Sequence, residues 1–193
     1  GPAQKYDLLS AMSNRADIEI RKGRAADLQG IAEVLVATWR STFGDMLPGA
    51  FLDAMTVGEQ IERHRRRMLA PEASYLVAAQ RKDDRIVGIA NSGPSRVPRM
   101  PYGAELYSLY VLDAFQGFGI GQGLVRAAAF DAVQRGSRSM LVWVLADNPN
   151  RRFYSRLGAV PVGRAPVTIG GITLGQVGYA WDDLTGQFGL EIA

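Results

Sequence analysis

The sequence feature that most constrains the fold is a glycine-rich turn at residues 116–123, which reads Gln-Gly-Phe-Gly-Ile-Gly-Gln-Gly. It lies between Glu105–Leu112, whose pattern predicts a strand, and Gly121–Gln134, whose apolar residues recur at helical spacing. Glycines leave backbone N–H groups unobstructed, and a helix N-terminus adds the positive end of its dipole, so the two together bind anions. The turn therefore predicts a phosphate site, or else simply a close contact between strand and helix.

Two common phosphate motifs do not match this turn. A P-loop needs Gly-Lys-Ser/Thr, whereas Gly121 is followed by Gln-Gly. The dinucleotide fingerprint G-x-G-x-x-G, started at Gly119, would need a glycine at Leu124 and an acidic residue about 20 positions further on. The downstream strand end offers Trp143 instead. Neither nucleotide motif fits the turn.

Composition excludes several classes of protein. The 193 residues fit one domain, and 47% hydrophobic with 21% charged residues is typical of a soluble globular chain. The absence of cysteine excludes disulfides and thiolate zinc sites, and a single histidine excludes metal clusters with two histidines. No apolar run approaches the roughly 20 residues of a membrane span, and the N-terminus lacks a secretion signal. We therefore expect a soluble cytoplasmic protein that uses no metal.

Hydrophobic periodicity predicts one mixed α/β domain at residues 16–193, preceded by a tag remnant or disordered N-terminus at residues 1–15. The expected strands are Asp17–Arg21, Ser74–Gln80, Arg85–Asn91, Glu105–Leu112, Met140–Ala146, Ala159–Gly163 and Ile172–Trp181. The expected helices are one capped by Asp27 that ends near Gly44, then Gly49–Leu69, Gly121–Gln134 and Asn150–Leu157.

Two motifs carry a resemblance to a known family. Gln116, Gly119 and Gly121 fill the acetyl-CoA signature Q/R-x-x-G-x-G/A. About 30 residues later, Asn148–Ala159 is similar to the segment N-x-x-x-x-F-Y-x-x-x-G. Together they resemble the GNAT superfamily of N-acetyltransferases, and the resemblance covers Ile18–Leu184.

The resemblance implies a fold and an activity. The fold would be a single α/β domain with a mixed, mostly antiparallel sheet of six or seven strands and helices on both faces. The sheet would splay between its fourth and fifth strands, which should pair in parallel because a helix connects them. The activity would be direct transfer of an acetyl group from acetyl-CoA to a primary amine through a ternary complex. The acceptor would be a small molecule or a peptide, and a homodimer is left open.

The resemblance also assigns site residues. Backbone groups of Leu109, Tyr110 and Val111 would bind pantetheine and the acetyl carbonyl. Backbone N–H groups of the turn would hold the pyrophosphate, and they belong to Gln116, Gly117, Phe118, Gly119, Ile120 and Gly121. Asn148 would hydrogen-bond the pantetheine, and Tyr154 would lie near the sulfur.

Amine acetylation needs a base for the amine and an acid for the leaving thiolate. Tyr154 is the expected acid, because a phenol pKa of about 10 is close to that of an alkyl thiol. Glu105 is the expected base by its position at the start of the fourth strand. The alternative for Glu105 is a glutamate at the rim of the sheet that faces solvent, in which case water or Asp147 would take the proton.

Two other functions compete with the enzyme. One is a catalytically inactive CoA-binding regulatory module. The other is nucleic-acid binding through Arg63–Arg67, which is disfavoured because no aromatic residues alternate with the arginines. Residues after Arg164 also carry only acidic charges. His64, inside the basic run, is expected to be solvated and not catalytic, with a pKa lowered by its arginine neighbours.

Overall fold

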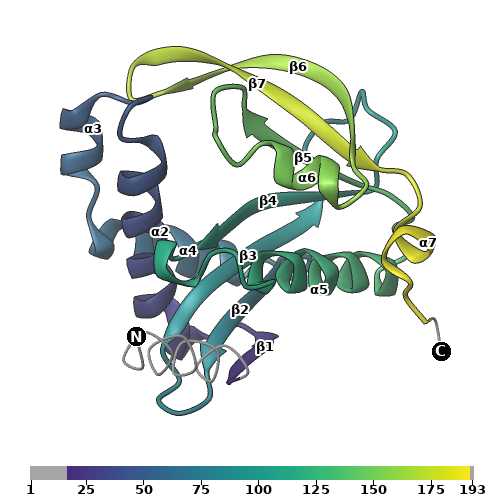
Figure 1. Ribbon diagram of the computed structural model, residues 1–193, viewed down its shortest axis with the longest axis horizontal. Coiled ribbons are helices and arrows are strands. Elements are labelled where there is room, and N and C mark those ends of the chain that lie inside the picture. The colour runs from purple at the N-terminus through teal and green to yellow at the C-terminus, as the bar shows by residue number, and fades with distance from the viewer. Residues whose placement is uncertain (1–16, 192–193) are drawn as a thin grey trace, which may run out of the picture.

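The computed structural model describes residues 17–191 as one seven-stranded sheet in the order β1-β2-β3-β4-β5-β7-β6, with helices on both faces (Figure 1). The strands are β1 Ile18–Lys22, β2 Ser74–Gln80, β3 Ile86–Pro94, β4 Ala104–Val111, β5 Met140–Leu145, β6 Val160–Ile169 and β7 Ile172–Trp181. The helices are α2 Leu28–Phe43, α3 Gly49–Ala54, α4 Val57–Met68, α5 Ile120–Gln134, α6 Arg152–Arg156 and α7 Leu184–Phe188. The N-terminal segment at residues 1–15 lies outside the described residues. No helix within residues 17–191 is long and apolar enough to cross a membrane.

The sheet parts between β4 and β5, as the resemblance implied. These two strands form the parallel pair of the sheet, and they pair only from Ala104 opposite Met140 to Leu106 opposite Val142. On its other side β4 stays paired with β3 to Val111, but the register skips Tyr107. Such a bulge bends a strand, and here it lies where β4 leaves β5. The remainder of β4 therefore faces a gap.

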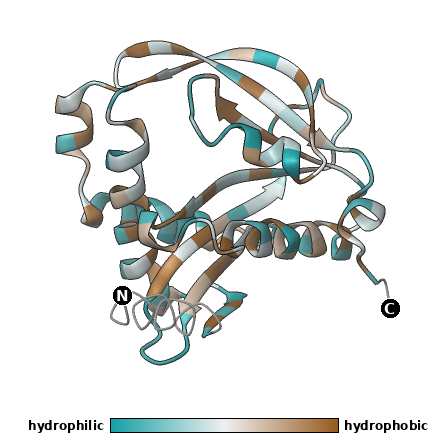
Figure 2. Ribbon diagram, in the orientation of Figure 1, coloured by the Kyte–Doolittle hydropathy of each residue, from teal (hydrophilic) through white to brown (hydrophobic). Residues whose placement is uncertain are grey.

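One face of the sheet is covered by α5, α6 and α7. The fully buried residues of α5, among them Leu124 and Ala128, pack against β3 and β4. Gly88 on β3 permits this close approach, since a Cβ there would lie 3.1 Å from Leu124. Figure 2 shows hydrophobic segments of β2, β3 and β5 in brown and the hydrophilic loop between β2 and β3 in teal. The strands β2 and β3 pair antiparallel on either side of this loop, so it is the turn of a hairpin.

The opposite face is covered by α2 and α4. The expected single helix over Gly49–Leu69 is wrong, because the chain is extended at Met55. Thr56 then starts α4, and its side chain accepts a hydrogen bond from the Glu59 N–H. Arg40 of α2 donates to the carbonyls of Leu52 and Met55, so α2 holds the end of α3 in place.

The hairpin of β6 and β7 is longer than expected and arches over to α3 (Figure 1). Pro161 and Pro166 interrupt the strand pattern in the sequence, but β6 is an edge strand, where proline is tolerated. At the tip, Gly170 has a φ of +60°, and a Cβ there would lie 2.8 Å from the Phe51 ring. Three apolar residues near the tip, Ile169, Ile172 and Leu174, pack on the cluster of Phe43, Leu47 and Leu52. The arch therefore closes one end of the parted sheet.

His64 is buried, so the expectation that it is solvated is wrong. It lies on the sheet-facing side of α4 with 3% of its surface exposed, and its Nδ1 is 2.7 Å from the Tyr75 hydroxyl. Burial first, and then Arg67 and Arg63, lower the pKa of His64 to about 4. The imidazole is therefore neutral at physiological pH.

This burial predicts a pH-dependent stability. The unfolded chain takes up the His64 proton near pH 6.5, whereas the folded chain resists it down to about pH 4. The contribution of the neutral His64 to the free energy of unfolding is thus complete above pH 6.5. It is lost as the pH falls toward 4, by about 3 kcal/mol in total. We expect urea unfolding to show a smaller loss in His64→Asn over this range. Parallel pH curves for the two proteins would contradict the buried neutral imidazole.

Candidate active site

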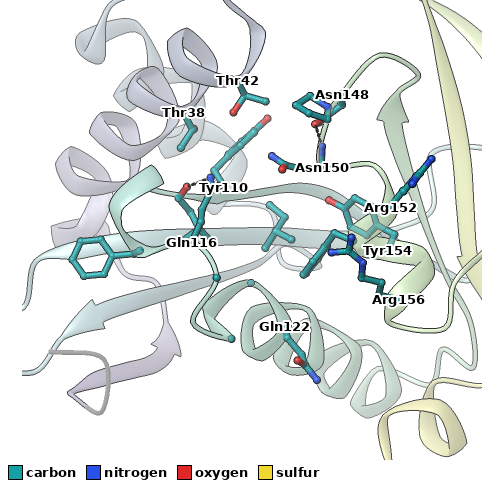
Figure 3. A pocket seen from close by; sticks show the side chains of 18 of the residues that line it. Thr38, Thr42, Tyr110, Gln116, Gln122, Asn148, Asn150, Arg152, Tyr154 and Arg156 are labelled. Atoms are coloured by element: carbon teal, nitrogen blue, oxygen red, sulfur yellow. Dashed lines mark hydrogen bonds between the residues drawn. The ribbon is translucent and has the colours of Figure 1, made fainter. Parts of the chain in front are cut away.

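A cleft of about 660 Å³ lies where β4 and β5 part. Its walls come from α2, the end of β4, the glycine turn, the loop at residues 148–150 and α6. Figure 3 shows Thr38 and Thr42 of α2 on one side and Tyr154 and Arg156 of α6 on the other. The cleft thus runs from the threonine side chains of α2 to the arginine side chains of α6 through the gap in the sheet.

The structure brings nine of the eleven expected coenzyme residues to this cleft. They are Leu109, Tyr110, Val111, Gln116, Gly117, Gly119, Gly121, Asn148 and Tyr154. Phe118 and Ile120 are not among the residues that line it, and the Ile120 side chain is buried in the core. Contact of these eleven residues with coenzyme A stays a prediction.

The glycine turn has the geometry of an anion site. Gly117 and Gly119 have φ values of +80° and +82°, which L side chains rarely adopt. A Cβ at either position would meet no atom within 4 Å, so it would project into open space. Gly119 is also the N-cap of α5, and no side chain caps this helix. The N–H groups of its first turn are therefore open to an anion.

Two arginines that the sequence reasoning missed also line the cleft. Arg152 and Arg156 lie one turn apart on α6, both are exposed, and neither forms an ion pair within residues 17–191 (Figure 3). Their spacing of four residues, on either side of the Phe-Tyr pair, could have indicated this pair of cations in the sequence, because it places both arginines on one face of the helix. Together with the glycine turn they make this end of the cleft positive, which suits a substrate with several phosphates.

Tyr154 contributes a buried hydroxyl to the same cleft. Its ring packs edge-on against Phe153 at 5.2 Å and stacks on Tyr179 at 6.2 Å between centroids. Burial, and to a smaller extent the neighbouring Tyr110, raise the pKa of Tyr154 well above 10. The phenol therefore holds its proton and can donate it only to a strong base.

Comparison with known proteins decides the family. Residues 31–159 match the family described as Acetyltransferase (GNAT) family. The chain belongs to this family. The GNAT chain is 31% identical over 168 residues to the uncharacterized N-acetyltransferase YuaI of Bacillus subtilis strain 168. The aligned residues make up 87% of this chain and 95% of YuaI. Membership makes it an N-acetyltransferase that depends on acyl-CoA.

Solved structures share the fold of this GNAT chain. PaiA N-acetyltransferase from Thermoplasma acidophilum, in complex with coenzyme A, has a TM-score of 0.63 at 20% identity, over 82% of this chain and 97% of PaiA. A GCN5-related N-acetyltransferase from Rhodopseudomonas palustris has a TM-score of 0.67 at 21% identity, over 85% of this chain and 94% of that one. The parted seven-stranded sheet is therefore the GNAT fold.

Glu105 is not brought to the cleft of this GNAT chain. Its side chain is 1% exposed, so the alternative of a solvent-facing rim residue is wrong. The carboxylate accepts hydrogen bonds from the Arg96 backbone N–H at 2.9 Å and from its guanidinium at 2.6 Å. Arg96 in turn stacks over the Tyr107 ring at 4.2 Å. The role of Glu105 as general base stays a prediction.

The glycine turn generates a test with a matched control. Gly119→Asp should raise the Kd of coenzyme A by about 10²-fold or more, because like charges brought together cost several kcal/mol. Gly136, at the other end of α5, has a similar φ of +89° and equally open surroundings, so Gly136→Asp carries the same backbone strain. Calorimetric titration should show normal affinity in the control. Equal affinities in both variants would remove the anion site.

Proposed function

We propose that the protein transfers an acetyl group from acetyl-CoA directly to a primary amine while both substrates occupy the cleft between β4 and β5. The cleft itself carries this proposal, since one continuous space joins a positive, glycine-rich end to the hydroxyl-bearing end at α2. In the reaction the amine nitrogen bonds to the thioester carbon, the carbon–sulfur bond breaks, the amine loses a proton and the thiolate gains one.

Backbone groups of β4 would hold the pantetheine arm. The Leu112 N–H donates to the Val87 carbonyl, and paired groups alternate along an antiparallel ladder. The backbone groups of Val111 and Leu109 therefore face the gap, whereas those of Tyr110 face β3. The Val111 carbonyl already accepts from Gln116 Nε2 at 3.1 Å, which leaves its N–H to polarise the thioester carbonyl.

The other end of coenzyme A would lie at the glycine turn. The open N–H groups at the start of α5 suit the pyrophosphate, and Arg152 and Arg156 suit its charge. Tyr154 lies between this end and the strand gap, and its phenol would donate a hydrogen bond to the departing thiolate and deliver the proton as the thiolate forms. The burial that raises the pKa of Tyr154 works against this transfer.

The amine would enter from the side of α2. Thr38, Thr42 and Tyr110 present hydroxyls there, and Asn148 and Asn150 face them across the cleft (Figure 3). A thiol-release assay with acetyl-CoA and a panel of amines tests the activity. Coenzyme binding without thiol release for any amine would favour an inactive regulatory module. Salt-sensitive binding of DNA or RNA would instead support the basic run on α4 as a functional surface.

The variant Tyr154→Phe tests the role of Tyr154 as the general acid. We expect kcat to fall by about 10²–10⁴-fold, the usual scale for general acid catalysis, while the Kd of acetyl-CoA stays nearly unchanged. Tyr179→Phe is the matched control, because Tyr179 stacks on Tyr154, is buried and does not line the cleft. Steady-state kinetics with the best amine of the panel measures both. Equal activities in the two variants would assign the proton to another donor.

The variant Glu105→Gln tests whether Glu105 is the general base that removes the amine proton. Leu109 lies four residues along β4 from Glu105, about 13 Å at 3.3 Å per residue, so proton transfer over that span needs intervening water. Both carboxylate oxygens are also engaged by Arg96. We therefore expect the variant to lose about 2 kcal/mol of stability and to keep the wild-type pH–rate profile. A rate loss at neutral pH that recovers toward the pKa of the amine would restore Glu105 as the base.

A further inference from the structure

A row of buried polar side chains crosses the sheet beneath α4. Tyr75 on β2 lies opposite Asn91 on β3, and Asn91 lies opposite Ser108 on β4. His64 of α4 lies at the Tyr75 end of the row. The exposed fractions of His64, Tyr75 and Asn91 are 3%, 5% and 3%. Polar groups buried this deeply must be hydrogen-bonded, so their pattern of donors and acceptors is informative.

The hydrogen bonds of the row run in one direction. Ser108 Oγ donates to Asn91 Oδ1 in a close contact. With its oxygen turned to Ser108, the Asn91 amide has its nitrogen, which can only donate, left for Tyr75 on the neighbouring strand. Asn91 therefore donates to the Tyr75 oxygen. The Tyr75 proton then points to His64 Nδ1, 2.7 Å away.

His64 can end such a row only as a neutral acceptor. An imidazole that accepts at Nδ1 carries its proton on Nε2. The burial of His64 and the charges of Arg63 and Arg67 on the same helix favour the neutral form. Every proton between Ser108 and His64 is thus directed away from β4.

The other end of the row lies at the edge of the cleft, where Ser108 is not itself a lining residue but its neighbour Leu109 is. Ser108 comes two residues after the last β4–β5 pair, at Leu106, and directly before Leu109, whose backbone faces the cleft. Its side chain is only half-buried, unlike the rest of the row. Because the hydroxyl has committed its one proton to Asn91, its lone pairs are left to accept a hydrogen bond.

We propose that Ser108 Oγ binds the acceptor amine by accepting one of its N–H bonds, and that Asn91, Tyr75 and His64 are positioning residues that fix this polarity. The proposal rests on the proposed amine acetylation. An amine held by one N–H turns its lone pair in a defined direction, which is the alignment that attack on a thioester needs.

The single histidine makes the polarity measurable. A nitrogen-15 spectrum of the imidazole contains one residue and needs no assignment. We expect the Nε2–H tautomer near neutral pH, and a shift of the Nδ1 signal in Tyr75→Phe. An Nδ1–H tautomer would reverse the direction of the row and overturn the proposal.

Kinetics test the contact with the amine, using the best amine of the thiol-release panel. Ser108→Ala should lower kcat/KM for that amine about tenfold, as expected for one lost hydrogen bond, and leave the Kd of acetyl-CoA within about twofold. Ser92→Ala is the control, since Ser92 is a buried serine of the neighbouring strand β3 that lies outside the row. His64→Asn places an oxygen near the position of Nδ1 and should preserve kcat/KM, whereas His64→Leu should lower it.

The outcomes separate this proposal from the one on which it rests. Turnover of an amine that is equally fast in wild type and in folded Ser108→Ala would overturn the role of Ser108 alone. Equal losses in His64→Asn and His64→Leu would overturn the positioning role of the row. Absence of turnover with every amine would instead overturn the proposed function, and this inference with it.

Discussion

The early parting of β4 and β5 is the constraint on which the rest of the molecule depends. The backbone N–H and C=O groups of two neighbouring parallel strands normally pair along the whole length of the strands. These two strands pair over only three residue pairs. The backbone of β4 beyond Leu106 is left with donors and acceptors that need other partners. A ligand with amide groups can supply them as a strand would. On the proposed function, bound coenzyme would complete the hydrogen bonding of β4.

The same face of β4 carries three polar side chains, and each is held by a residue from another element. Glu105 is fixed by Arg96 of the loop that follows β3, and Ser108 is fixed by Asn91 of β3. Tyr110 packs against Trp39 of α2 at 6.5 Å. Side chains that are oriented before the substrate arrives lose little freedom when it binds. These side chains of β4 are therefore held in place before any substrate binds.

Much of the fold was predictable, because local signals and long-range structure agree. The glycine turn, the buried strand after it and the Phe-Tyr segment predicted the central β4-α5-β5-α6 unit and most of the residues that line the cleft. The predictions from sequence fail where contacts between distant residues determine the element bounds or the burial of a side chain. The break between α3 and α4 depends on one extended residue, Met55, and the length of β6 depends on its place at the sheet edge. The burial of His64 depends on which face of α4 meets the sheet, and four flanking charges hid that face in the sequence.

The arch of β6 and β7 has a consequence for how the protein folds. The residues of β4, the glycine turn and α6 that line the cleft lie between positions 109 and 156, so they meet through short loops. The apolar cluster beside α3 is completed by Ile169 and Ile172, more than 100 residues after Phe51 and Leu52. Contacts of such sequence separation form late, since loop closure must come first. During synthesis the β4, glycine-turn and α6 walls of the cleft can therefore assemble before the C-terminal hairpin packs on α3.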